Sequence, residues 1–262
     1  MEILVCIKQV PGTTEVKIDE ETGVLKRDGV ESKMNPYDLY AVETALKIKE
    51  SNGATVNVIS MGPPQAAEII KEAYMMGVDG GALLTDRKFA GADVLATSYA
   101  LSQGVKKLGS PDLIICGKMT TDGDTAQVGP ELAEFLGIPH ASNVLKINSI
   151  GESTVIVESD MGDTVEVLEL QYPCLISVDK GIFQPRLPSF RLKLATQDRN
   201  IPCIGIDDLE DKNEYNYGLN GSPTQVKRVF PPQVNTGHEI WEGDGIELAG
   251  RIFNKLKKLK FV

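Results

Sequence analysis

The sequence contains few of the residues that enzymes use for acid–base catalysis. Its 262 residues include two histidines, His140 and His238. No spacing of serine, histidine and aspartate predicts a nucleophilic triad, and no cluster has the spacing of metal ligands. We therefore expect no catalytic residue and no metal site in this chain, and we expect each histidine to be a surface or packing residue.

Cysteine pairs and long apolar segments are also absent. The four cysteines form no CxxC pair, and three of them lie in apolar runs where a free thiol behaves as a small hydrophobe. The first residues, Met1 to Cys6, enter an apolar run directly, without a basic leader or a membrane-length stretch. These features predict a protein of the reducing cytoplasm, without export or a membrane span.

Positive charge is in deficit, since the net charge is −10. Non-specific nucleic-acid binding needs lysine and arginine to displace counterions, so it is disfavoured. The basic tail at residues 255–260 is a local exception, which we interpret as the solvated face of a last helix. With 42% hydrophobic and 24% charged residues, the composition is that of an ordinary globular protein.

Strands and helices alternate along the first 140 residues. Apolar runs at 2–7, 55–61, 81–85 and 112–117 predict buried strands, and helical patterns follow Asn35-Pro36 and occupy 65–76 and 93–108. This βαβ rhythm predicts an α/β fold with a doubly wound, mostly parallel sheet and helices on both faces. Ligands of such sheets bind at the carboxyl ends of the strands, near a switch in strand order.

The pattern changes after residue 150. Residues 153–158 and 164–170 predict a hairpin, and 174–178 a further strand. From about residue 196 the chain lacks a strong core pattern until a final helix. We expect an α/β domain over 1–195 and a C-terminal arm over 196–262 that needs a partner surface; a helix folded back on the same domain is the alternative.

The loop at 117–130 is the most informative segment. It follows the strand 112–117 and precedes an amphipathic helix that ends at Gly137, so backbone N–H groups can converge there on an anion. It matches neither GxGxxG nor GxxxxGK[ST], which favours binding over hydrolysis. Lys118 and the threonines offer a cation and hydroxyls, Gly123 allows close backbone approach, and Asp122 and Asp124 are expected to cap the helix or bind ribose hydroxyls.

Several segments, in order and spacing, resemble the β-subunit of electron transfer flavoproteins. They are 5–11, 28–30, 34–38, Gly62-Pro63, the loop at 117–130, 166–177 and Pro185-Arg186. The resemblance covers nearly the whole chain. It implies an adenine-nucleotide alpha-hydrolase-like α/β fold and a heterodimer in which the C-terminal arm packs on the α-subunit.

The resemblance also implies a nucleotide site. Its cofactor-binding residues are Cys6, Asn35, Pro36, Tyr37, Asp38, Met61, Gly117, Lys118, Met119, Thr120, Thr121, Asp122, Gly123, Asp124, Thr125, Ala126, Gln127 and Val128. A segment around 188–193 resembles the loop that docks client dehydrogenases, with Ser189, Phe190, Arg191 and Leu192 as docking residues and Phe190 in place of a usual leucine.

Two branches of this family differ in the nucleotide. The housekeeping branch holds AMP and shuttles electrons, whereas the electron-bifurcating branch holds a second FAD. The stretch 121–130 resembles the bifurcating type, as does 221–226. That branch implies NADH as hydride donor, a dehydrogenase such as an acyl-CoA dehydrogenase as one acceptor and ferredoxin or flavodoxin as the other. A nucleotide-hydrolysing or nucleotide-sensing α/β protein is a further alternative, which the missing phosphate-transfer motif disfavours.

Overall fold

The computed structural model describes residues 1–12, 17–18, 25–26, 32–227 and 237–262. The segment 28–30, part of the family resemblance, lies outside the described residues. The chain divides into two compact units, of which the first contains residues 1–17 and 25–227. The second contains residues 18–24 and 228–262.

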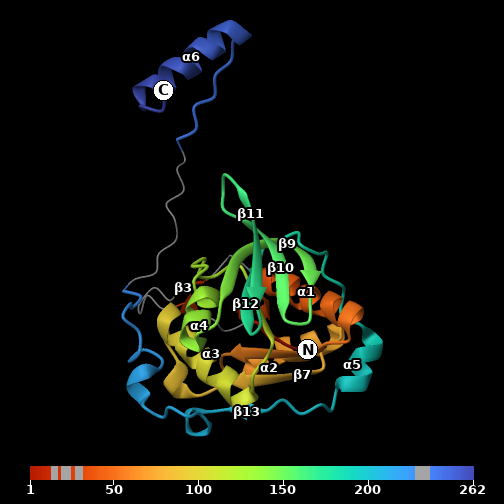
Figure 1. Cartoon of the computed structure of the whole chain (residues 1–262). Coiled ribbons are helices and arrows are strands. Elements are labelled where there is room, and N and C mark those ends of the chain that lie inside the picture. Colours follow the sequence, from red (N-terminus) through yellow and green to blue (C-terminus); the bar gives the residue numbers. More distant parts are fainter. Residues whose placement is uncertain (13–16, 19–24, 27–31, 228–236) are drawn as a thin grey trace. The chain divides into compact units, whose positions relative to one another are not determined.

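A nine-stranded sheet forms the centre of the first unit (Figure 1), in the order β11-β10-β9-β12-β8-β1-β6-β7-β13. Its strands are β1 (Glu2–Cys6), β6 (Thr55–Met61), β7 (Gly80–Leu84), β8 (Leu113–Gly117), β9 (His140–Ile150), β10 (Thr154–Asp160), β11 (Val165–Gln171), β12 (Cys174–Val178) and β13 (Cys203–Ile204). The strands from β9 through β12 to β13 run parallel, and β10 and β11 pair antiparallel. The predicted mostly parallel sheet is confirmed.

The strand order reverses at β1. The chain moves from β1 to β6 and β7 on one side, and then from β8 to β12 on the other. This arrangement is that of a doubly wound sheet with its switch point between β1 and β8. Two small sheets stand apart: β2 (Gln9–Pro11) pairs with β5 (Ser32–Met34), and β3 (Lys17–Ile18) with β4 (Leu25–Lys26).

Helices cover both faces, as predicted. On one face α1 (Pro36–Asn52) and α2 (Ala67–Met76) pack on Ile3, Val5 and other alternate strand residues. On the opposite face α3 (Val94–Leu108) and α4 (Val128–Leu136) pack on Leu4, Cys6 and their neighbours. Each central strand is therefore buried on both sides, which explains its unbroken apolar sequence.

Residues 196–227 belong to the same compact unit as the sheet, which therefore extends beyond the boundary expected at 195/196. β13 extends the sheet beside β7, and Tyr217 is fully buried against Phe89 and Tyr99. Three short 3-10 helices, Arg87–Phe89, Ile206–Asp208 and Glu214–Asn216, lie in or beside this cluster, and a fourth covers Pro64–Ala66. Because of these contacts, the first unit extends to Lys227.

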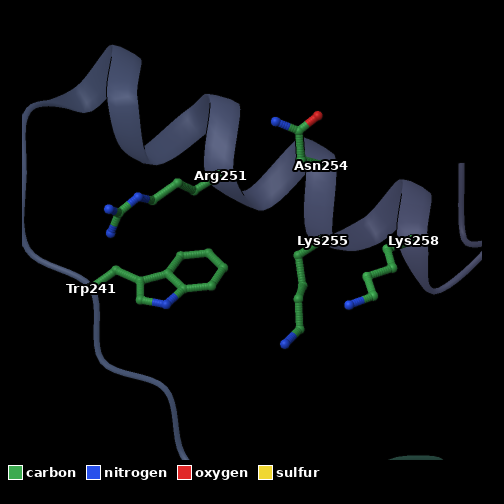
Figure 2. Close-up of a pocket in the computed structure, with 5 residues that line it drawn as sticks. All are labelled: Trp241, Arg251, Asn254, Lys255 and Lys258. Carbon is green, nitrogen blue, oxygen red and sulfur yellow. The ribbon is translucent and has the colours of Figure 1, made fainter.

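The second unit contains α6 (Gly245–Lys258), which has no buried residue. One stripe of the helix is apolar and consists of Ala249, Ile252, Phe253 and Leu256, continued by Leu259 at the C-cap. Figure 2 shows Trp241 beside the basic residues Arg251 and Lys255 in an open pocket of about 330 Å³ that Asn254 and Lys258 also line. The helix thus presents an apolar surface with no intramolecular cover among the described residues of its unit.

Candidate functional site

The predicted nucleotide residues gather at the switch point of the sheet. Cys6, Met61 and Gly117 end the parallel strands β1, β6 and β8, so they lie at the same edge. Cys6 is directly opposite Cys116 in the β1–β8 register. The segment from Gly117, the last residue of β8, to Val128, the first residue of α4, is called the switch loop.

Asn35 fixes the first half of the switch loop. Its side chain is fully buried, and its amide nitrogen donates to the Met119 carbonyl oxygen at 2.9 Å. Its amide oxygen accepts from the Thr121 backbone N–H at 3.2 Å. Asn35 does hold the N-cap position of α1, but its side chain makes no capping bond there. The asparagine therefore connects the helix start to the loop.

Asp38 and Gly117 pack against each other where β8 meets the start of α1. The Asp38 carboxylate accepts from the Lys8 backbone N–H at 2.7 Å and from the Asn35 amide at 2.9 Å. A Cβ at Gly117 would lie 2.5 Å from Asp38 Oδ1 and 2.7 Å from the Tyr37 carbonyl carbon, so only glycine fits. Burial raises the pKa of Asp38 to about 7, although these hydrogen bonds oppose the shift.

The second half of the switch loop is exposed from Thr121 to Gln127. Asp124 and Ala126 have left-handed backbones, with φ of 49° and 55°, whereas Gly123 does not. A Cβ at Gly123 would meet only Thr120 Oγ1, at 3.5 Å. The space over this half of the loop is thus open to solvent. The left-handed backbone conformations occur at Asp124 and Ala126, not at Gly123 itself.

Two charged side chains of the switch loop, Lys118 and Asp122, are paired with neighbouring elements. Lys118 Nζ lies 2.8 Å from Asp179 Oδ2, just after β12. Asp122 accepts from Lys8 Nζ at 2.8 and 2.9 Å. The expectation that an aspartate caps α4 is wrong, because Gln127 holds the N-cap position without a side-chain bond. Lys8 was missed as a site residue, although it follows β1 at the switch point.

This geometry fits a phosphate-bearing nucleotide. The start of α4 has no side-chain cap, so its first N–H groups and helix dipole face the loop region. Gly117 brings the loop against the start of α1, and Pro36 and Tyr37 open that helix beside it. The polar backbone, the exposed threonines and the open space form a cradle for an anion.

A second group of contacts lies at the start of α3. Asp93 caps that helix through the Ala96 N–H at 3.1 Å. Its other oxygen accepts from the backbone and hydroxyl of Thr224, at 2.9 and 2.7 Å. Ser222 in turn accepts from the Asp93 N–H at 2.8 Å. The segment 221–226 is therefore attached at a helix start that follows β7.

The predicted docking residues lie around α5 (Phe190–Thr196), which packs on α2. Ser189 caps the helix and donates its N–H to the Met75 carbonyl oxygen at 2.8 Å. Phe190 is 72% exposed, Arg191 is exposed and Leu192 is half-buried. Leu187, which precedes the helix, is a further apolar side chain that is 87% exposed.

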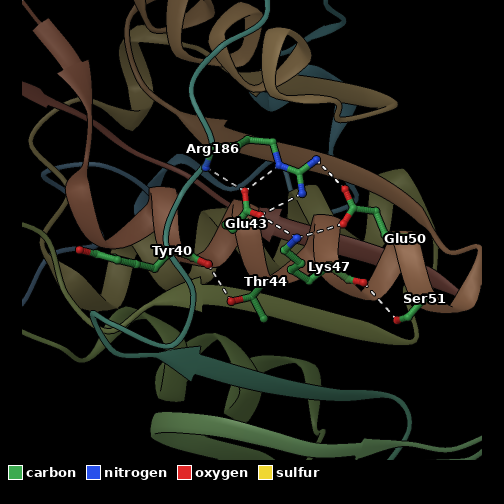
Figure 3. A network of polar contacts seen from close by, with 7 residues as sticks. All are labelled: Tyr40, Glu43, Thr44, Lys47, Glu50, Ser51 and Arg186. Carbon is green, nitrogen blue, oxygen red and sulfur yellow. Dashed lines mark hydrogen bonds and ion pairs between the residues drawn. The ribbon is translucent and has the colours of Figure 1, made fainter.

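Arg186 attaches this segment to α1 (Figure 3). Its guanidinium contacts the buried Glu43 carboxylate at 2.7 and 2.9 Å, and its backbone N–H donates to the same group at 3.0 Å. It also reaches Glu50 at 2.8 Å. The helix α1, which begins beside the switch loop, thus also positions the segment that leads into α5.

Comparisons with known proteins agree with this architecture. Residues 22–202 match the electron transfer flavoprotein domain. The electron transfer flavoprotein subunit beta of Clostridium acetobutylicum is 43% identical over 100% of both chains. The caffeyl-CoA reductase-Etf complex subunit CarD of Acetobacterium woodii is 44% identical over 98% of each chain. Protein FixA of Azotobacter vinelandii is 39% identical over 89% of this chain and 85% of its own length.

Within the described part of the chain, every helix is too short or too polar to cross a bilayer. The family match covers most of the α/β unit, and the relatives match along nearly their full length. The chain therefore belongs to the electron transfer flavoprotein family, as a beta subunit.

Proposed function

We propose that this chain is the small subunit of an electron-bifurcating electron transfer flavoprotein and holds an FAD at its switch point. The observation that carries the proposal is the switch loop: Asn35 fixes its first half, and its open second half leads into the uncapped start of α4. The flavin would supply the redox chemistry. The chain's own residues would bind and orient the nucleotide, which agrees with a sequence poor in catalytic groups.

FAD is favoured over AMP by the charge and size of the switch loop. FAD carries one more phosphate than AMP, and an unpaired carboxylate near it would cost affinity. Here Asp122 is paired with Lys8, and Gly123 leaves open space where a larger residue would protrude. Ser222 and Thr224 are held at the start of α3 by hydrogen bonds with Asp93, so they offer a second fixed segment that the longer cofactor could contact.

The proposed partners follow from family and surface. The unpartnered apolar stripe of α6 is suited to an α-subunit surface, and exposed Leu187 and Phe190 to a client dehydrogenase. A relative is named for a caffeyl-CoA reductase complex, which supports an acyl-CoA dehydrogenase as client. Ferredoxin or flavodoxin is the proposed low-potential acceptor, and four free cysteines support a cytoplasmic location.

Titration of the purified heterodimer with NADH tests this function. We expect NADH to reduce the flavin of the complex and to drive reduction of ferredoxin or flavodoxin only when the client's acceptor is present. A complex that NADH does not reduce would support the housekeeping, AMP-holding alternative. Gly123→Asp adds a carboxylate to the open half of the loop and should lower the FAD content; unchanged flavin content would contradict the role given to Gly123.

A further inference from the structure

Lys8 forms an ion pair with the switch loop. It lies two residues after the end of β1, and its Nζ contacts both carboxylate oxygens of Asp122, which is 114 residues away in sequence. The two side chains are 44% and 33% exposed, so the pair is accessible at the edge of the cradle. Lys8 also donates its backbone N–H to the buried Asp38 carboxylate.

The remaining charges of the cradle make this pairing important. Lys118, the lysine within the switch loop, is engaged by Asp179. Asp122 therefore depends on Lys8 for its neutralisation. Partial burial is the largest single influence on the pKa of Asp122 and would raise it, but the hydrogen bond and charge of Lys8, together with hydrogen bonds from Thr120 and the backbone, outweigh burial and hold the pKa below its usual value. Asp122 is thus a carboxylate that stays ionised beside the proposed phosphate site.

We infer that Lys8 determines nucleotide affinity at the switch point by neutralising Asp122, which would otherwise repel the phosphate groups of an adenine nucleotide. This inference rests on the proposed nucleotide site and assigns a role to a residue that the sequence did not place in that site. The pair ties the loop to the end of β1, so Lys8 also holds the loop near the uncapped start of α4. Lys8 is a positioning residue, acting through Asp122.

A merely structural role predicts different behaviour. A partly exposed ion pair contributes little to stability, because solvent screens its charges and two long side chains must be held in one geometry. Lys8→Met should therefore leave heterodimer assembly and thermal unfolding close to those of the unmodified complex. Its effect should appear in nucleotide binding, and it should diminish in high salt, which screens partly exposed charges.

The test measures FAD and AMP dissociation constants of the heterodimer by calorimetry, after removal of bound nucleotide. The variants are Lys8→Met, Lys8→Arg, Asp122→Asn and the double variant Lys8→Met/Asp122→Asn. Lys71→Met is the matched control, because Lys71 forms a comparable exposed ion pair with Glu68, at 2.7 Å, on α2.

We expect Lys8→Met to weaken binding roughly tenfold and to have less than about a twofold effect when Asp122 is already Asn. Lys8→Arg should bind like the unmodified complex, as should Lys71→Met. Equal nucleotide dissociation constants for Lys8→Met and Lys71→Met would overturn the inference. It would also be overturned if Lys8→Met weakened binding by the same factor in the unmodified complex and in the Asp122→Asn variant. An unmodified heterodimer that binds neither FAD nor AMP at this chain would instead refute the proposed function.

Discussion

Gly117 is the residue at which strand, helix and loop come closest. The backbone of β8 ends against Tyr37 and Asp38 of α1, at distances that exclude a side chain. We expect Gly117→Ala to destabilise the chain by about 1–3 kcal/mol, because the buried Asp38 and the start of α1 would have to move. Urea unfolding measures this change.

Gly123→Ala is the control for that substitution. Gly123 lies six residues further along the same loop, where a Cβ meets only Thr120 Oγ1 in ordinary contact. The unfolding free energy of the Gly123→Ala variant should therefore stay within about 0.5 kcal/mol of that of the unmodified chain. If both alanine variants were equally stable, the close packing assigned to Gly117 would be wrong.

Asp38 predicts a specific pH dependence of stability. Its pKa is raised by burial to about 7 in the folded chain and is near 3.8 without that burial. Between these values the folded state binds the extra proton, so the contribution of Asp38 to stability falls as pH rises from about 4 to about 7. Above that range the contribution is constant.

Asp38→Asn removes this titration. The difference in unfolding free energy, variant minus unmodified chain, should therefore increase from pH 4 to pH 7 and then level off. Urea unfolding at closely spaced pH values measures it. A difference that is independent of pH across this range would show that Asp38 titrates normally, and would contradict its described burial.

At the scale of elements, α1 connects the switch loop with the segment before α5, which are the proposed nucleotide and docking sites. Glu43 is buried on this helix, and Arg186 is its close partner, with Lys47 at 3.8 Å. Arg186→Met should cost about 2–3 kcal/mol, because it leaves a buried carboxylate without its main partner. Hydrogen exchange should increase in residues 182–189, which precede α5.

Glu50→Gln separates this effect from a general loss of charge. Glu50 also contacts Arg186, but it is an exposed residue, so its loss should cost less than about 1 kcal/mol. Equal effects of the two variants would mean that the buried contact with Glu43 is not what holds the segment.

The helix α6 supplies a second prediction at this scale. Ile252 lies on its apolar stripe, and the sole tryptophan, Trp241, lies in the same unit. Binding of the α-subunit should shift Trp241 emission to the blue as its surroundings become drier. Ile252→Asp should weaken the heterodimer by about 30-fold or more, as for a buried interface residue.

Asn254→Asp adds the same charge on the other side of α6, away from the stripe. It should leave assembly intact. If Ile252→Asp assembled as tightly as Asn254→Asp, the apolar stripe would have no role in the heterodimer.

Sequence patterns predicted the central elements well, for a physical reason. Strands buried on both faces have continuous apolar sequences, and glycines such as Gly137 mark helix ends, so local composition identifies them. The strand β9 was missed, because Asn143 adopts a left-handed backbone within it and its pairing with β10 and β12 is irregular. A shifted register interrupts the alternation that would have revealed the strand.

At the scale of the whole molecule, the compact unit that contains the sheet extends to Lys227, further than the sequence pattern indicated. Ile204, Ile206, Leu209 and Tyr217 are buried, but their spacing follows neither a helical nor a strand period. Long-range packing, which a local pattern does not reveal, attaches residues 196–227 to the sheet. In the same way, the spacing of the switch loop predicted an anion site, while the partnership of Lys8 with Asp122 required the fold.

The central claim is that this chain holds a second flavin at the switch point of its sheet. The most direct measurement is the number of nucleotides released from the purified, denatured heterodimer, with FAD and AMP quantified separately. The account predicts two FAD and no AMP for each heterodimer. One FAD and one AMP would contradict it.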